Sequence, residues 1–162
     1  MMMRCAIAVI STSFTYSCLA DLKEQSTAQM CTLLNDTQLR AGEWITRQDG
    51  SEGCASGARL VKGAAGEINR ISYAAEGSEG KSSRVKLVLN VLSPSTDDAA
   101  KRELIRASKR LSVRVLGMSI PHSFDEAIMK GTPIVLEVGS GKTVLTPTAA
   151  NNQSYVLTVV ME

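Results

Sequence analysis

The clearest pattern in the chain lies between residues 84 and 92, where apolar and polar residues alternate one by one. The apolar positions on one side of this segment are Val85, Leu87, Leu89 and Val91. Successive side chains of a strand point to opposite faces of a sheet, so this alternation predicts a β-strand with one buried face. Weaker patterns over residues 58–62 and 68–75 predict two preceding strands, and the linkers between them favour an antiparallel meander.

A different periodicity predicts a long helix over residues 97–115. Apolar residues recur there every three or four positions, at Ala100, Leu104, Ala107, Leu111 and Val115. This spacing gives a narrow apolar stripe along one side of a helix. Ser95 or Thr96 is expected to cap its start, and Gly117 is expected to end it.

The remaining segments complete a mixed fold. Ser123 and Glu126 have the spacing of a capping box and predict a short second helix. Strands are expected over residues 134–138, 143–145 and 155–160. An N-terminal helix is expected over residues 21–35, which lack Gly and Pro. The predicted order is one helix, three strands, two helices and three strands on the same sheet, which indicates the α+β class with an antiparallel β-meander.

The first 20 residues have the pattern of a secretory signal peptide. A positive charge, a short apolar run and small residues come in that order before a polar start at residue 21. The apolar run is too short to span a membrane. Cleavage after Ala20 would leave a single α+β domain over residues 21–162. Lipidation of Cys18, which would anchor the protein to a membrane, is one alternative, and an N-terminal strand or helix of a cytosolic protein is another.

Export changes the interpretation of the cysteines, because disulfides persist in oxidising compartments. Cys31 and Cys54 remain after residue 20, and a disulfide between them is predicted, with two free thiols as the alternative. A closed loop of about 22 residues makes such a bond worth about 3 kcal/mol. A zinc site is not expected, because the chain has one histidine, His122, and no CxxC pair.

Composition sets further limits on function. A chain of 162 residues with 44% hydrophobic content suits one globular domain. The formal net charge of +2 gives no general attraction to nucleic acid. The segment 139–143 resembles a phosphate-binding loop, but Leu136 stands where that motif needs glycine, and a strand-like segment follows it. A hairpin turn is therefore predicted there, and no cofactor is expected.

No catalytic residue can be assigned from the pattern. His122 has no partner in the sequence that would orient it as a general base. The acidic pairs at residues 97–98 and 125–126 lie at predicted helix starts, where carboxylates are expected in any case. No G-x-S-x-G motif occurs. A hydrolase with an unrecognised site stays open as an alternative.

The long predicted helix is rich in cations. Five of them cluster opposite the apolar stripe: Arg102, Arg106, Lys109, Arg110 and Arg114. Such a surface suits an acidic protein, or an anionic lipid or glycan surface, and the alternative is an ordinary solvated helix face. Polar stretches over residues 50–57 and 76–83 are predicted as loops and as further candidate contact sites.

These features favour an exported, non-enzymatic protein-binding domain, periplasmic or secreted. An accessory or immunity-type component of a bacterial envelope or secretion system fits this description. The order of elements is similar to that of small secretion-chaperone and immunity-type α+β domains, a likeness of fold that assigns no residue roles. A small-ligand or envelope-binding module is the alternative, and a concave apolar pocket would favour it.

Overall fold

The computed structural model describes residues 22–23, 25–63, 66, 68–92, 94, 97–151 and 154–162. Two predictions therefore lie outside the described residues. One is the signal peptide over residues 1–20, including the lipidation of Cys18. The other is the capping of the long helix by Ser95 or Thr96.

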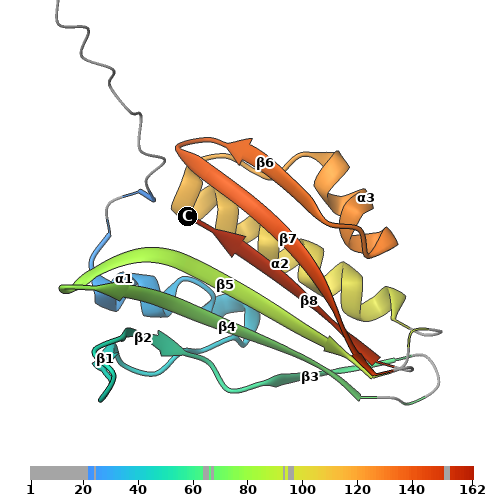
Figure 1. The fold of residues 1–162 in the computed structure, drawn as a ribbon, viewed down its shortest axis with the longest axis horizontal. Coiled ribbons are helices and arrows are strands. Elements are labelled where there is room, and N and C mark those ends of the chain that lie inside the picture. Colours follow the sequence, from blue (N-terminus) through green and yellow to red (C-terminus); the bar gives the residue numbers. More distant parts are fainter. Residues whose placement is uncertain are drawn as a thin grey trace, which may run out of the picture.

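Within the described residues, eight strands form one antiparallel sheet (Figure 1). They are β1 (Ile45–Thr46), β2 (Glu52–Ala55), β3 (Arg59–Lys62), β4 (Ile68–Ser78), β5 (Lys81–Val91), β6 (Ile134–Val138), β7 (Gly141–Asn151) and β8 (Ser154–Met161). Their order across the sheet is β1-β2-β4-β5-β8-β7-β6, and β3 also pairs with β4. The C-terminal strand β8 thus lies in the interior of the sheet, between β5 and β7.

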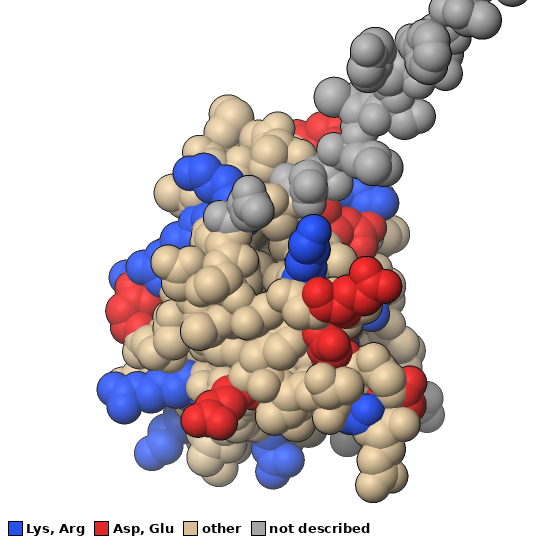
Figure 2. Space-filling view, turned by 90° about the vertical axis from the view of Figure 1, so that its left-hand side faces the viewer, with Lys and Arg blue, Asp and Glu red and all other residues tan. Residues whose placement is uncertain are grey.

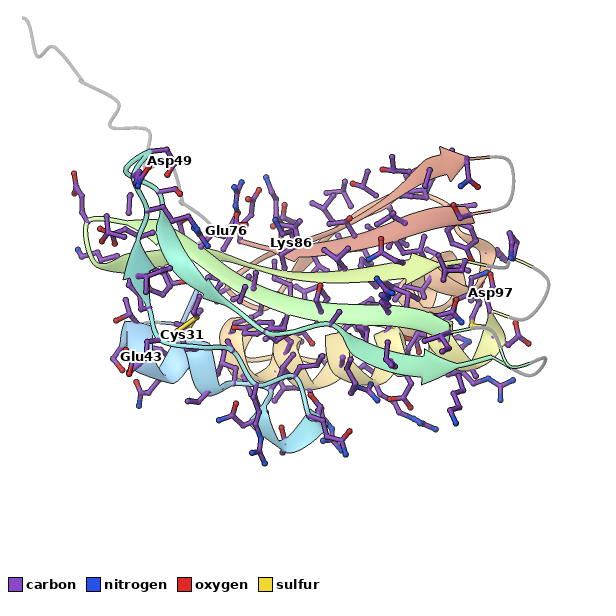
Figure 3. All side chains as sticks on the ribbon, turned by 90° about the horizontal axis from the view of Figure 1, so that it is seen from below. Cys31, Glu43, Asp49, Glu76, Lys86 and Asp97 are labelled. Atoms are coloured by element: carbon purple, nitrogen blue, oxygen red, sulfur yellow. A yellow bond between two sulfur atoms is a disulfide. The ribbon has the colours of Figure 1, made fainter. Side chains whose placement is uncertain are left out.

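The helices of the described residues are α1 (Thr27–Thr32), α2 (Asp98–Leu116) and α3 (His122–Lys130), with a 3₁₀ turn, η1 (Asn35–Thr37), after α1. Figure 3 shows α1 and α2 together on one side of the sheet. The helix α2 contacts β3, β4, β5 and β8, so it crosses the middle of the sheet. Figure 1 shows α3 next to β6.

The core forms where two sequence patterns meet. The alternating apolar residues of β5 all point toward the helices and are fully buried: Val85, Leu87, Leu89 and Val91. The stripe on α2 faces them, and Leu104, Leu111 and Val115 are also fully buried. Removing such side chains from water contributes about 1.5–3 kcal/mol each, which makes this contact the main source of stability between the layers.

The α+β class and the antiparallel sheet are confirmed, but the predicted order is not, because five strands precede α2. The predicted loop over residues 50–57 contains β2. Gly53 lets β2 approach β4, since a Cβ atom there would lie 2.2 Å from the carbonyl oxygen of Ala75. Residues 76–83, predicted as a loop at a hairpin tip, do form a hairpin, but the loop is shorter than predicted because β4 and β5 extend to a tight turn at residues 79–80.

The N-terminal helix predicted over residues 21–35 is not confirmed. The helix α1 has six residues and begins at a capping box in which Ser26 and Gln29 exchange hydrogen bonds. It ends where Leu34 turns into the core and becomes fully buried. Tertiary burial of that leucine therefore outweighs the local helical pattern.

Two further boundaries differ from the prediction. The helix α3 begins at His122 with Pro121 at the N-cap position and no side-chain cap, so the capping box expected at Ser123 is wrong. The strand β7 continues to Asn151, beyond the predicted end at residue 145, because its positions from Thr143 to Ala149 pair with β8. Pairing with a neighbouring strand thus extends β7 beyond its apolar part.

The predicted disulfide between Cys31 and Cys54 is confirmed, with an S–S distance of 2.12 Å and a Cα–Cα distance of 5.9 Å. It ties α1 to β2, and both residues are buried (Figure 3). Beside it, the hydroxyl of Tyr73 donates a 2.6 Å hydrogen bond to the carbonyl oxygen of Met30. Burial raises the pKa of Tyr73, so this donor keeps its proton. Two independent links therefore hold α1 against the sheet.

We expect the double variant Cys31→Ser/Cys54→Ser to lose about 3 kcal/mol of unfolding free energy, because the cross-link restricts the unfolded chain. Chemical denaturation at neutral pH measures the loss. Wild-type protein in the presence of a reductant is the control and should match the double variant. An unchanged denaturation midpoint in both samples would show that the bond does not stabilise the fold.

Candidate functional site

The five cations predicted to cluster on α2 lie on its outward side. Arg102, Arg106 and Arg110 are exposed, whereas Lys109 and Arg114 are partly buried. The apolar stripe of the same helix fills the core. The packing of that stripe therefore turns these cations away from the sheet, and they form one surface, which we name the α2 basic surface.

Four of these cations contact carboxylates. Arg106 pairs with Glu103 in the preceding turn, and Lys109 pairs with Asp125 of α3. The other two, Arg110 and Arg114, both reach Asp36. Within the described residues, Arg102 contacts no carboxylate. The fold thus uses most of this surface to connect α2 to its neighbours.

Asp36 receives the most hydrogen bonds in this network. Arg114 donates to its two carboxylate oxygens at 2.9 and 2.8 Å, and Arg110 donates to one of them at 3.1 Å. The hydrogen bonds from Arg114 hold the pKa of Asp36 below its ordinary value of 3.8. Arg114 also donates to the carbonyl oxygen of Leu33. The end of α2 is in this way fixed to the turn that follows α1.

A second carboxylate bridges α2 to the sheet. Glu103 accepts a 2.8 Å hydrogen bond from Arg59 of β3 and another from Arg106. Burial raises the pKa of Glu103, but the hydrogen bonds from both arginines outweigh this effect and the pKa is lowered. The Nε atom of Arg59 is buried without a hydrogen-bond partner. One donor of this network is therefore unused.

A hollow of about 270 Å³ lies between these two networks. Its lining residues are Asp36, Thr37, Gln38, Arg59, Glu103, Arg106, Ala107 and Arg110. Together with Arg59, the α2 basic surface has six cations, and they contact three carboxylates, Asp36, Glu103 and Asp125, which leaves a formal charge of +3. The surface stays basic although five of its six cations are paired.

Charge is distributed differently at the end of the molecule where β4 turns into β5. Figure 2 shows basic and acidic side chains next to each other there, without a continuous patch of either sign. On the sheet face opposite the helices, Glu76 and Lys86 lie side by side (Figure 3). The α2 basic surface therefore differs from the β4–β5 end of the molecule, because only the former has a net excess of cations.

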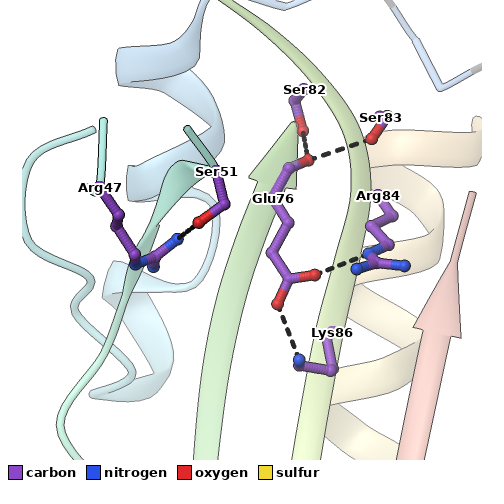
Figure 4. A network of polar contacts seen from close by, with 7 residues as sticks. All are labelled: Arg47, Ser51, Glu76, Ser82, Ser83, Arg84 and Lys86. Carbon is purple, nitrogen blue, oxygen red and sulfur yellow. Dashed lines mark hydrogen bonds and ion pairs between the residues drawn. The ribbon is translucent and has the colours of Figure 1, made fainter. Parts of the chain in front are cut away.

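Glu76 is the centre of the polar network on that open face (Figure 4). Its carboxylate accepts hydrogen bonds of 2.6 Å from Arg84 and 2.7 Å from Lys86. Burial raises its pKa, but these two donors outweigh burial and lower it. All three residues lie on the paired strands β4 and β5, so the network holds the register of this hairpin.

His122 does not have the surroundings of a general base. Its side chain is 83% exposed, with Nδ1 3.5 Å from Asp125 and Nε2 3.6 Å from Glu126. Asp125 is already engaged by Lys109. The acidic pair at residues 125–126 thus contacts cations of α2 and α3 and the imidazole at the surface.

The sequence did not identify a buried polar cluster at the start of α2. Lys101 forms a 2.9 Å ion pair with Asp97 and donates a 2.9 Å hydrogen bond to the carbonyl oxygen of Met129, and the hydroxyl of Tyr155 donates to Asp97. The ammonium nitrogen of Lys101 lies 5.5 Å from the centre of the Tyr155 ring. This cluster connects α2, α3 and β8. The i, i+4 spacing of Asp97 and Lys101 is a local signal for part of it.

Burial, together with the neighbouring Asp97, raises the pKa of Tyr155, so its hydroxyl keeps its proton and acts as a donor. The side chains of Asp97 and Lys101 are 7% and 11% exposed. Charges this deeply buried must be paired, since an isolated charge would lose its hydration. The cluster therefore stabilises the junction of two helices and a strand.

The segment that resembles a phosphate-binding loop is a hairpin turn. The segment 139–143 contains the turn between β6 and β7, with no helix behind it. Among the described residues, no group of three or more His, Cys, Asp or Glu side chains is placed to hold a metal ion. No helix in the described part of the chain is long and apolar enough to cross a membrane.

Comparison with known proteins gives no relative. The chain matches no family model, no curated protein sequence and no solved structure. Its function is therefore inferred from the geometry of its own residues.

We expect Asp97→Ala to lower the free energy of unfolding by about 3–5 kcal/mol, because Lys101 would stay buried without its counter-charge. The matched control is Asp97→Ala combined with Lys101→Met, which removes both charges and should cost substantially less. Denaturant unfolding of both variants measures the difference. Equal losses would contradict an ion pair at this position.

A second expectation concerns pH. The pKa values of Asp36, Glu76 and Glu103 are lowered in the folded state, so these carboxylates stabilise the fold above their ordinary pKa values. That stability is lost as pH falls through about 4.5 toward 3, where the folded protein must take up protons. Unfolding at pH 7 and pH 3.5 measures the effect.

Glu76→Gln should lower stability at pH 7 and reduce its dependence on pH, whereas Glu43→Gln, at an exposed position, should change neither. A Glu76→Gln variant with the same pH dependence as wild type would rule out a contribution from this carboxylate.

Proposed function

We propose that this protein is an exported, non-enzymatic domain that binds an acidic surface of another protein through the α2 basic surface. The proposal places it outside the cytoplasm, in the periplasm or in secreted form, as an accessory or immunity-type component of an envelope or secretion system. A lipid anchor at Cys18 is the alternative to a freely diffusing form.

The disulfide between Cys31 and Cys54 supports export. Such bonds persist in oxidising compartments and are rare in the cytosol of mesophiles. Both sulfur atoms are buried between α1 and β2, where the bond has a structural role rather than that of an exposed redox centre. An oxidising environment is therefore the setting in which this fold is most stable.

The excess of cations on the α2 basic surface carries the proposal of an acidic partner. The ion pair between Arg110 and Asp36 is formed by exposed side chains, and exposed pairs of this kind contribute about 0–1 kcal/mol each. A carboxylate of a partner can therefore replace Asp36 beside Arg110 at low cost. The guanidinium groups are already held in place around the hollow, so binding restricts fewer side chains than it would on an unpaired helix.

The triple variant Arg102→Glu/Arg106→Glu/Arg110→Glu should lose its acidic partner. In a pull-down from the extracytoplasmic fraction of the organism that makes the protein, we expect partner recovery to fall at least about tenfold, because like charges would then face each other. Binding by the wild type should also weaken as salt is raised to about 0.5 M. Quantitative mass spectrometry of the eluates measures both effects.

The matched control reverses three exposed cations elsewhere, Arg47, Lys81 and Lys130, and should retain the partner. Thermal unfolding of both variants checks that each is folded. Glutamine at the same three α2 positions serves as a milder variant, because glutamate there also loses the pairs with Glu103 and Asp36. Full recovery of the partner by both folded α2 variants would refute this function.

A further inference from the structure

The strand β3 forms an open edge of the sheet. It pairs with β4 on one side, and Figure 1 shows it at the lower border of the sheet, with no described helix or strand beyond it. Just before β3, the chain itself adds an extended segment to this edge: Ala41 forms a bridge with Ser56, and the amide of Gly42 donates a 3.2 Å hydrogen bond to the carbonyl oxygen of Ala55. That pairing ends before β3 begins.

Two residues of β3 direct their backbone groups toward this open edge. The amide of Ser56 donates a 2.8 Å hydrogen bond to the carbonyl oxygen of Tyr73, so Tyr73 directs its backbone groups toward the side of β4 on which β3 lies. This direction repeats at every second position of a strand, and the next two such positions of β4 lie opposite Arg59 and Val61, which therefore bond to β4. The residues whose groups face outward are Leu60 and Lys62. No hydrogen bond within the described part of the chain reaches these groups.

The side chain of Leu60 is also available to a partner. It is 56% exposed, and it points to the sheet face opposite the helices because its neighbour Val61 points into the core. A free strand edge pairs readily with another chain, and proteins often place a charge such as that of Lys62 there to select against the wrong partner. An unpaired edge with an exposed leucine is therefore a candidate for strand addition, in which an extended segment of another protein joins the sheet.

Cations surround this edge on both faces of the sheet. On the face opposite the helices, Lys62 and Arg70 are exposed and contact no carboxylate of the described residues. On the helix side, Arg59 lines two hollows of about 270 and 360 Å³, and three more arginines line one or the other. These are Arg40, Arg106 and Arg110. A strand added to β3 would thus have cations beside both of its faces.

The charge of this region stays positive when its carboxylates are included. The three carboxylates are Asp36 and Glu103, which line the first hollow, and Glu67, which directly precedes β4 in the sequence. Against the six cations of β3, β4 and the two hollows they leave a formal charge of +3. Self-pairing of two such edges would oppose like charges, whereas an acidic strand would neutralise them.

We propose that the acidic partner binds by adding an extended segment to β3, next to the α2 basic surface. This inference rests on the proposed function, because it describes how the partner of that surface is held. Main-chain hydrogen bonds to Leu60 and Lys62 supply affinity, and the alternating side chains of the added strand supply specificity.

The residues of β3 define the sequence that fits. On the face opposite the helices, an apolar side chain beside Leu60 and an acidic one beside Lys62 match their neighbours. On the helix side, an acidic side chain opposite Arg59 reaches the hollow that Arg106 and Arg110 line. The partner segment therefore has two acidic residues separated by two others, one of which is apolar.

The test uses three hexapeptides with blocked ends. The first has the sequence Thr-Glu-Thr-Val-Glu-Thr, which follows this pattern in an antiparallel strand. The second has lysine in place of both glutamates. The third keeps the acidic sequence but has N-methyl groups on the amides of its first glutamate and its valine. Those two amides would bond to β3, so the third peptide keeps the charges and side chains and loses the pairing.

Each peptide is titrated to about 2 mM into isotope-labelled protein, because a single short strand binds weakly. We expect the acidic peptide to shift the amide signals of Leu60 and Lys62, to slow their hydrogen exchange, and to bind at least about tenfold more tightly than either control. Equal binding of the lysine peptide would overturn the recognition of acidic residues. Equal binding of the N-methylated peptide would overturn strand pairing, and no response at these two amides would overturn the site.

Two variants of one residue test the edge in the protein. Leu60→Pro removes an outward amide donor and leaves the bonds between β3 and β4 intact, since proline is tolerated on an edge strand where the amide faces solvent. Leu60→Ala keeps the donor and removes most of the side chain. We expect peptide binding to fall at least about tenfold in the first and about threefold in the second. Thermal unfolding checks that both are folded, and the N-methylated peptide tests the same bonds in the wild type.

Capture of the natural partner separates this inference from the proposed function. Capture at the wild-type level by folded Leu60→Pro, together with loss of the partner from the Arg102→Glu/Arg106→Glu/Arg110→Glu variant, would overturn strand addition and leave the proposed function standing. Loss of the partner from both variants, with retention by Leu60→Ala, is the result that supports strand addition.

Discussion

The pairing of β5 with β8 is the constraint on which the rest of the structure depends. It runs from Val85 opposite Met161 to Val91 opposite Tyr155, and it joins the strands that precede α2 to those that follow α3. The pairing closes a long loop that contains both longer helices, which costs conformational entropy. The buried faces of the two strands offset this cost, because together they form the surface on which the apolar stripe of α2 packs.

Once that stripe is buried, polar contacts at both ends fix the position of α2. At its start, Asp97 and Lys101 hold Tyr155 of β8; at its end, Arg114 holds Asp36. The second contact depends on the disulfide, because Asp36 lies in the turn just after α1 and Cys31 lies within α1. Core packing, the cross-link and the ion pairs therefore act on the same helix, and they orient the α2 basic surface.

The parts of this fold that sequence could predict are those set by local periodicity. The strand β5 and the helix α2 each repeat one pattern over many residues, and the disulfide was predicted from two cysteines in a chain expected to be exported. The tip of the β4–β5 hairpin was misjudged because both of its faces are polar at the edge of the molecule. The cluster around Asp97 was missed because Tyr155 reaches it through strand pairing, which no local pattern encodes.

The same limit explains why the basic helix was only partly understood from sequence. Charge counting identified the cations, but the carboxylates that pair with Lys109, Arg110 and Arg114 come from α3 and η1, which lie far from α2 along the chain or on another helix. If the proposed partner binds this surface, its carboxylates would have to replace internal ones at every cation except Arg102. Exchange lowers the net gain from each new ion pair, because an old pair is lost. It favours partners that present several acidic groups at once, since only their sum exceeds the pairs already formed.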